Sequence, residues 1–167
     1  GGSQGARSIN NHVMRNYKEN IDKNIQIIWQ TGNQSDDIIG QINNKNIKII
    51  DFIDDIENAY AASDLVISRA GATAISEILY LAKPSILIPY PYAAENHQEL
   101  NARALSCKDA AIMVKEENFK EGILEKEIFS LISSKHRIKA MKKNAANFAY
   151  RDSSTLIKNK IEEIISC

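Results

Sequence analysis

The chain has 167 residues, enough for one compact domain with a sizeable core. Its 21 lysines and arginines balance its 21 aspartates and glutamates, which argues against a basic protein that binds nucleic acid. No apolar run approaches the ~18 residues that cross a bilayer, and no signal peptide is evident. Cys107 and Cys167 lack metal-ligand spacing. These features favour a globular protein of the reducing cytoplasm.

Strands and helices alternate along the chain. The expected strands are short and nearly continuously apolar, which is typical of strands buried on both faces of a parallel sheet. In chain order we expect a helix at 6–18, a strand at 26–30, a helix at 35–43, a strand at 47–52, a helix at 56–62, a strand at 65–68, a helix at 72–82, a strand at 85–88, a helix at 96–106, a strand at 111–114, and helices at 124–132, 135–149 and 153–165. The pattern predicts one α/β domain over residues 1–167 with a doubly wound parallel sheet, whose ligands bind beyond the carboxyl ends of the strands.

The first residues, Gly1–Ala6, have the composition of a phosphate-binding turn between a strand and a helix. The sequence contains no strand that could lead into this turn. In doubly wound folds the first strand is usually central, so its loss leaves two neighbouring strands without a hydrogen-bonding partner. We therefore expect the natural protein to continue upstream of Gly1.

The same residues also fit the G-x-S-x-G pattern of a hydrolase nucleophile elbow. A hydrolase would need an acid and a histidine later in the chain, for which Asp64 or Asp109 and His136 are the candidates. His136 lies between a lysine and an arginine in a basic predicted helix, and nothing around it indicates an oriented base. This alternative is therefore disfavoured.

Residues 68–77 (SRAGATAISE) join a buried strand to an amphipathic helix through a turn of small residues. At such a turn the backbone can approach a ligand closely, and the amides of the helix N-terminus suit a diphosphate. Glu77 projects away from the apolar stripe and shares a face with Thr73. A carboxylate there can accept hydrogen bonds from a ribose diol, so the segment predicts a nucleotide site.

Five segments together resemble glycosyltransferase family 28. They are Gly1–Arg7 (GGSQGAR), 52–55 (FIDD), 68–77, Pro84 and 97–102 (HQELNA), in the family's order and spacing. The resemblance covers essentially the whole chain. It implies the carboxyl-terminal, donor-binding half of a two-domain GT-B enzyme, with a Rossmann-like sheet. Such an enzyme transfers N-acetylglucosamine from UDP to lipid I, forming lipid II for peptidoglycan.

The resemblance also implies roles for the residues that match the family's nucleotide site. Ser3 and Gln4 would face the diphosphate with the amides of their turn. Ile53 would contact uracil through its backbone, and Arg69 would lie at the uracil end of the site. The diphosphate would rest on the residues that open the helix, Ala72, Thr73 and Ala74.

Four further matching residues would hold the two sugars. Glu77 would bind the ribose hydroxyls. His97 and Gln98 would reach the N-acetylglucosamine hydroxyls, and Asn101 would shape that pocket. Each role suits its residue, because an amide both donates and accepts, and a carboxylate accepts from two hydroxyls.

The family's other half is absent from this chain. By resemblance, that N-terminal domain binds lipid I, carries the candidate base and associates with the cytoplasmic face of the cell membrane. This absence leaves catalysis by the chain alone in question. The implied chemistry is a direct inverting displacement at the anomeric carbon, with no cofactor and no metal. Asp54 and Asp55 could belong to a metal site, but they are better interpreted as the start of the following helix.

Other interpretations of these residues stay open. Glu77 or His97 taken singly would more often be a surface residue, and Arg69 could form a structural ion pair. Trp29 and Tyr60 are expected in or beneath the core, without a chemical role. The chain could also be the soluble donor-binding subunit of a split N-acetylglucosamine transferase, or a non-catalytic nucleotide-sugar binding module.

Overall fold

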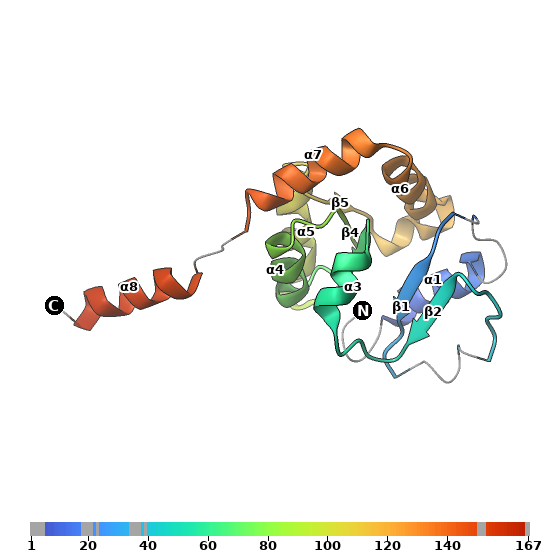
Figure 1. Cartoon of the computed structure of the whole chain (residues 1–167), viewed down its shortest axis with the longest axis horizontal. Helices are drawn as coiled ribbons and strands as arrows, with labels where there is room; N and C mark the ends of the chain where they lie inside the picture. The colour runs from blue at the N-terminus through green and yellow to red at the C-terminus, as the bar shows by residue number, and fades with distance from the viewer. Residues whose placement is uncertain are drawn as a thin grey trace.

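The computed structural model describes residues 6–17, 22, 24–33, 38, 40–149 and 153–165 (Figure 1). Its elements are α1 (Arg7–Tyr17), β1 (Ile27–Gln30), β2 (Ile47–Ile50), α3 (Ile56–Ala62), β3 (Val66–Ser68), α4 (Ala72–Tyr80), β4 (Ser85–Leu87), η1 (Ala94–Asn96), α5 (His97–Ser106), β5 (Ile112–Met113), η2 (Glu116–Glu121), α6 (Ile123–Ile132), α7 (Lys135–Ala146) and α8 (Ser153–Ile165). The expected alternation of strand and helix is therefore confirmed from β2 to β5.

The five strands that the structure describes form two parallel sheets. In the first, β1 pairs with β2 so that Ile27 lies opposite Ile47. In the second, the strand order is β3-β4-β5, with α4 and α5 as the crossovers. Within the part of the chain that the structure describes, no strand joins the two sheets. The sequence predicted one continuous sheet, and the division into two sheets differs from it. The division agrees with the expectation that two neighbouring strands lack a hydrogen-bonding partner.

The strand β4 is covered on both faces. Ile86 and Ile88 point into one apolar cluster with residues of α1, α6 and α7, and Leu87 points into a second cluster with residues of α3, α4 and α5. All three side chains are 0% exposed. Successive strand residues face opposite sides of a sheet, so helices lie on both faces of β4, as a doubly wound sheet requires.

Three predicted helices end earlier than expected. The helix α4 stops at Tyr80 because Ala82 has a left-handed φ of 48° and the amide of Lys83 bonds back to the carbonyl of Ile78. The helix α7 ends at Ala146 rather than at 149. The predicted helix at 35–43 lies partly outside the described residues. Its last residues, 40–43, are a turn and irregular chain.

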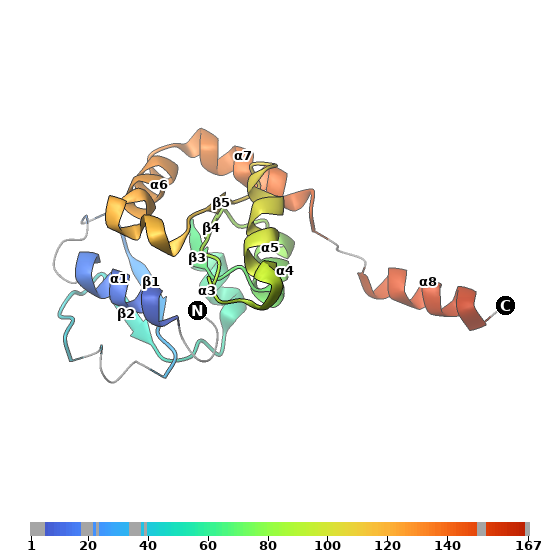
Figure 2. The same ribbon diagram turned by 180° about the vertical axis from the view of Figure 1, so that it is seen from behind.

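The two figures show how the helices surround the strands. In Figure 1, α4 and α5 lie on the side of β4 and β5 opposite α1, α3 lies between them and the first sheet in this view, and α6 and α7 close one end. Figure 2 shows the same grouping from behind. The helix α8 projects away from the rest of the chain, with Ile161, Ile164 and Ile165 exposed (Figure 1). No helix within the described ranges has the length and apolar character of a membrane span.

Candidate functional site

The turn between β3 and α4 exposes the amides of a helix N-terminus. Gly71 is the N-cap of α4, with φ −71° and ψ 148°, and no side chain caps this end. The first intrahelical bond runs from the amide of Ile75 to the carbonyl of Gly71 (3.0 Å). By helix geometry, the amides of Ala72, Thr73 and Ala74 have no intrahelical acceptor. A helix N-terminus of this kind can bind an anion, and the binding predicted from the sequence stays a prediction.

The backbone conformation at position 71 does not require a glycine. Its φ and ψ are open to any residue, and a Cβ added there would meet no atom within 4 Å. The space around the missing Cβ of Gly71 is therefore open. This supports the interpretation that the backbone is bared here for a ligand.

Glu77 lies on the same helix beyond its first turn and is half-buried. The Tyr60 hydroxyl of α3 donates a hydrogen bond to Oε2 of this carboxylate (3.1 Å). Glu77 is therefore held in place by a neighbouring helix, which differs from the free surface carboxylate that the residue alone would suggest.

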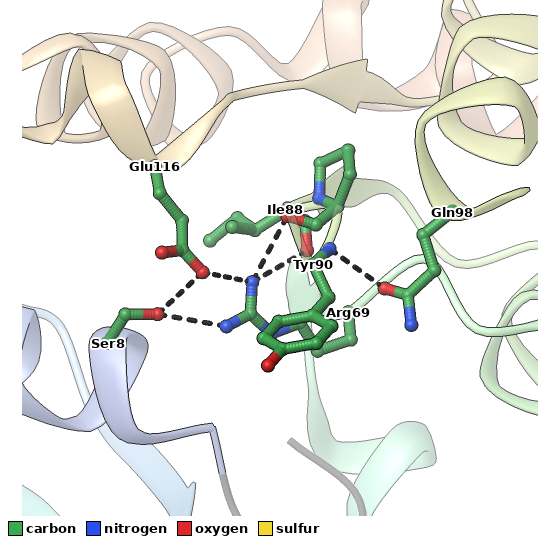
Figure 3. Close-up of polar contacts among 7 residues, drawn as sticks. Ser8, Arg69, Ile88, Tyr90, Gln98 and Glu116 are labelled. Atoms are coloured by element: carbon green, nitrogen blue, oxygen red, sulfur yellow. Dashed lines mark hydrogen bonds and ion pairs between the residues drawn. The ribbon is translucent and has the colours of Figure 1, made fainter. Parts of the chain in front are cut away.

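The helix α5 brings two amide side chains beside the turn. The Asn101 Nδ2 donates to the carbonyl of Ala70 (3.2 Å), which leaves its Oδ1 as an acceptor. The Oε1 of Gln98 accepts from the backbone N–H of Tyr90 (3.0 Å). Because a backbone N–H can only donate, the Gln98 Nε2 is the free end, and Figure 3 shows it pointing away from Tyr90. The two amides thus offer one donor and one acceptor, a combination that suits sugar hydroxyls.

His97 opens α5 and is exposed. Its Nδ1 lies 2.7 Å from the carbonyl of Ala94, so Nδ1 carries the hydrogen of that bond. In the neutral ring Nε2 is then a free acceptor. The residues just before it, Glu95 and Asn96, have left-handed φ values of 49° and 51°. Such strain often accompanies a binding loop.

Arg69 is enclosed by protein groups (Figure 3). Its guanidinium forms a 2.5 Å ion pair with Glu116 and donates to the hydroxyl of Ser8 (2.9 Å). It also donates to the carbonyls of Ile88 and Pro89. The Tyr90 ring lies 5.4 Å from its Cζ. The ion-pair alternative raised from the sequence is present, and a contact between Arg69 and substrate stays a prediction.

The remaining predictions concern the loop between β2 and α3 and the first residues of the chain. Ile53 is half-buried in the loop between β2 and α3, and Asp55 is the N-cap of α3, accepting from the amide of Asn58 (3.1 Å). The interpretation of Asp55 as the start of a helix is confirmed. Ser3 and Gln4 lie outside the described residues. The structure therefore places Asn101 against Ala70, just before α4, and Gln98 against Tyr90, whose ring lies beside Arg69. That these residues and Glu77 form one ligand site stays a prediction.

The hydrolase alternative finds no support. His136 is exposed at the start of α7, and Asp64 and Asp109 are exposed elsewhere. Among the described residues, no hydrogen bond or ion pair joins His136 to either acid. A base oriented by a carboxylate is the feature that this alternative needed.

Sequence reasoning missed four contributors, which are Ser8, Tyr60, Tyr90 and Glu116. Tyr60 was expected only in the core, and it is buried, but its hydroxyl also binds Glu77. Glu116 lies 47 positions beyond Arg69, and a single sequence carries no signal for a pair so far apart.

Comparisons with known proteins show the family of the chain. The model of the glycosyltransferase family 28 C-terminal domain matches residues 1–157. The chain belongs to glycosyltransferase family 28. It is 43% identical, over 166 residues, to the UDP-N-acetylglucosamine–N-acetylmuramyl-(pentapeptide) pyrophosphoryl-undecaprenol N-acetylglucosamine transferase of Cytophaga hutchinsonii, covering 99% of this chain and 45% of that protein. The enzyme of the same name from Acetivibrio thermocellus is 41% identical over 170 residues, covering 99% and 46%.

The fold of this family 28 chain is also that of a solved relative. The crystal structure of Acinetobacter baumannii MurG matches with a TM-score of 0.83 at 24% sequence identity, covering 97% of this chain and 50% of that one. The Rossmann-like fold predicted from the sequence is thereby confirmed. The chain spans about half the length of the curated relatives it matches.

Proposed function

We propose that this chain binds UDP-N-acetylglucosamine and is the donor-binding part of a hexosyltransferase that transfers N-acetylglucosamine to lipid I, forming lipid II in peptidoglycan synthesis. The observation that carries the proposal is the start of α4. There, the helix amides have no side-chain cap, the space beside Gly71 is open, and Glu77 is held beyond the first turn. Relatives whose printed names state this transfer match 99% of the chain and support the same assignment.

The diphosphate would sit against the amides of Ala72, Thr73 and Ala74. As the bond from the anomeric carbon to the diphosphate breaks, negative charge grows on the leaving oxygen. Amides that are already aligned at a helix N-terminus stabilise this charge without reorganisation. The acceptor hydroxyl attacks from the face opposite UDP, so the configuration inverts. Ser3 and Gln4 would add to the diphosphate site, and this part of the proposal rests on the resemblance alone.

The nucleoside and the transferred sugar would lie on either side of the diphosphate. Ile53 and Arg69 would face the uracil end, and Glu77 would accept from the ribose hydroxyls. Gln98 would donate to a hydroxyl of N-acetylglucosamine through its free Nε2, and Asn101 would accept through Oδ1. His97 would complete this end of the pocket.

Lipid I and the base that takes the acceptor proton would belong to the half of the relatives that this chain does not match. The acceptor is a lipid, so the complete enzyme would work as a peripheral protein on the cytoplasmic face of the cell membrane. No cofactor is required for the displacement as proposed.

Calorimetric titration of the chain with UDP, UDP-N-acetylglucosamine and UDP-glucose tests the donor site. We expect binding to all three, with UDP-N-acetylglucosamine bound more tightly than UDP-glucose. A folded sample that ignores uridine nucleotides at millimolar concentration would refute the proposal.

Glu77→Ala tests the nucleoside end separately. The loss of a charged acceptor should weaken UDP by about 1–3 kcal/mol. Glu121→Ala is the matched control, because Glu121 is an exposed acid at the end of η2. Equal UDP affinity in Glu77→Ala and the control would remove the ribose role.

The transfer itself is tested by complementation. The full-length gene should restore growth to a strain depleted of lipid II synthesis, and a non-catalytic binding module would fail to do so. Finding the acceptor domain upstream in the same reading frame would decide against a split, two-subunit enzyme.

A further inference from the structure

The contact between Tyr60 and Glu77 joins two helices at the candidate ribose site. Tyr60 lies in α3, is 8% exposed, and belongs to the apolar cluster that also holds Ile75 and Ile78 of α4. Its hydroxyl reaches Oε2 of Glu77 at 3.1 Å. The phenol is therefore fixed by packing, and its only mobile part is the hydroxyl that meets the carboxylate.

Tyr60 is a permanent donor in this contact. Burial raises the pKa of its hydroxyl above the ordinary value, and the hydrogen bond and charge of Glu77 raise it further. The hydroxyl thus keeps its proton throughout the physiological range. It can only direct that proton at Glu77, and the carboxylate oxygen that receives it is engaged.

We propose that Tyr60 is a positioning residue that orients Glu77 for the ribose. With Oε2 held by the phenol, Oε1 is left to accept from the ribose diol, and the carboxylate is held in one rotamer before the nucleotide arrives. A carboxylate fixed in advance loses little entropy on binding. Tyr60 thereby strengthens the preference for a ribonucleotide over a deoxyribonucleotide. This inference rests on the proposed function, because it assigns Glu77 to the ribose.

A purely structural role for Tyr60 is the competing interpretation, and the structure offers a control for it. Lys83, which follows α4, donates to the carbonyls of Ala61 (3.3 Å) and Ser63 (3.0 Å) at the end of α3. This second polar contact also ties the two helices together, but it does not touch Glu77. A variant of Lys83 therefore loosens the helix pair and leaves the carboxylate in place.

The test compares the dissociation constants of UDP and 2′-deoxy-UDP for the wild-type chain, Tyr60→Phe and Lys83→Met. Tyr60→Phe retains the buried ring and removes only the hydroxyl. We expect the wild-type chain to bind UDP more tightly than 2′-deoxy-UDP. In Tyr60→Phe the ratio of the two dissociation constants should fall about fivefold because UDP binds more weakly, which is the scale of one hydrogen bond. The affinity for 2′-deoxy-UDP should stay within about twofold, and Lys83→Met should keep the wild-type ratio.

Two further variants make the outcome decisive. In Glu77→Ala, adding Tyr60→Phe should change the ratio no further, because Tyr60 acts through Glu77. Glu77→Asp keeps the charge, but its shorter side chain moves the carboxylate away from the Tyr60 hydroxyl. This variant should lose the preference for UDP over 2′-deoxy-UDP although Tyr60 is unchanged.

The inference is overturned if Tyr60→Phe weakens both nucleotides equally, leaves the ratio unchanged, or adds its effect to that of Glu77→Ala. A wild-type preference for UDP over 2′-deoxy-UDP in Glu77→Asp would also overturn the inference. Failure of the wild-type chain to bind UDP would instead remove the proposed function, so the two failures are distinguishable.

Discussion

Arg69 and Glu116, 47 positions apart, form an ion pair of 2.5 Å at the carboxyl end of the second sheet. Their side chains are 13% and 22% exposed, so both charges are largely withdrawn from water. Ser8 at the start of α1 bonds to both partners. The pair therefore links the turn before α4 to η2 and to the helix beside the first sheet (Figure 3). Where the described residues show no strand between the sheets, this network connects them.

Arg69→Met should destabilise the fold. It would leave the Glu116 carboxylate and the carbonyls of Ile88 and Pro89 without their shared donor, at a cost of about 1–3 kcal/mol. Urea unfolding of Arg69→Met, Glu116→Gln and the double variant measures the coupling, which we expect to be about 1–2 kcal/mol.

Arg103→Met is the matched control, because Arg103 is an exposed cation in a helical ion pair and should change stability little. If Arg69→Met weakened UDP binding and left stability unchanged, Arg69 would act on the ligand rather than on the fold.

Gly71→Ser should separate folding from binding at the start of α4. The new Cβ meets open space, and a serine at the N-cap accepts from the first amides, so stability should hold or rise by about 0.3 kcal/mol. The same serine competes with a diphosphate for those amides, and UDP affinity should fall by about fivefold. Thermal unfolding and calorimetry check the two parts, with uridine as the ligand that lacks phosphate. Unchanged UDP binding would mean that the diphosphate lies elsewhere.

Local patterns were sufficient to predict most of the fold. The helix at Ile56–Ala62 was expected with the bounds it has, because Asp55 supplies a cap and the apolar spacing is helical. Errors came at helix ends. Ala82 adopts a left-handed φ that its residue type does not indicate, and it closes α4 two residues early.

Without the family resemblance, the candidate site was predictable only where its residues are close in sequence. The turn at Gly71 and the acid at Glu77 lie on one strand-turn-helix segment, so spacing alone places them together. Tyr60, Ser8 and Glu116 reach the site through tertiary packing, and their spacing from it carries no periodic signal. The division into two sheets follows from strand pairing, which local patterns do not reveal.

The two most strongly shielded tyrosines should make the fold sensitive to alkali. Burial raises the pKa of Tyr60 and of Tyr17, each of which also lies near a glutamate. The folded chain therefore holds these protons more tightly than the unfolded chain. The stability they contribute is complete below the ordinary tyrosine pKa of 10.0 and is lost as pH rises beyond it.

Urea unfolding between pH 9 and pH 11 measures this loss. Each tyrosine should contribute up to about 1.4 kcal/mol per pH unit above its ordinary pKa, so Tyr60→Phe should make the decline shallower by that amount. Tyr17→Phe, in the other apolar cluster, should do the same independently. An alkaline decline that is identical in both variants and wild type would contradict the assignment.

Gln98 should recognise the transferred sugar and not the nucleotide. Its Oε1 is engaged by the Tyr90 amide, so Nε2 is the end available to a ligand. Gln98→Ala should therefore weaken UDP-N-acetylglucosamine by about 1 kcal/mol and leave UDP unchanged. Gln98→Glu keeps an acceptor for Tyr90 but replaces the outward donor, and it should weaken the sugar nucleotide at least as much. Calorimetry with both ligands checks this. Wild-type affinity in Gln98→Glu would show that the donor is not used, and an equal loss of UDP would move Gln98 to the nucleotide end.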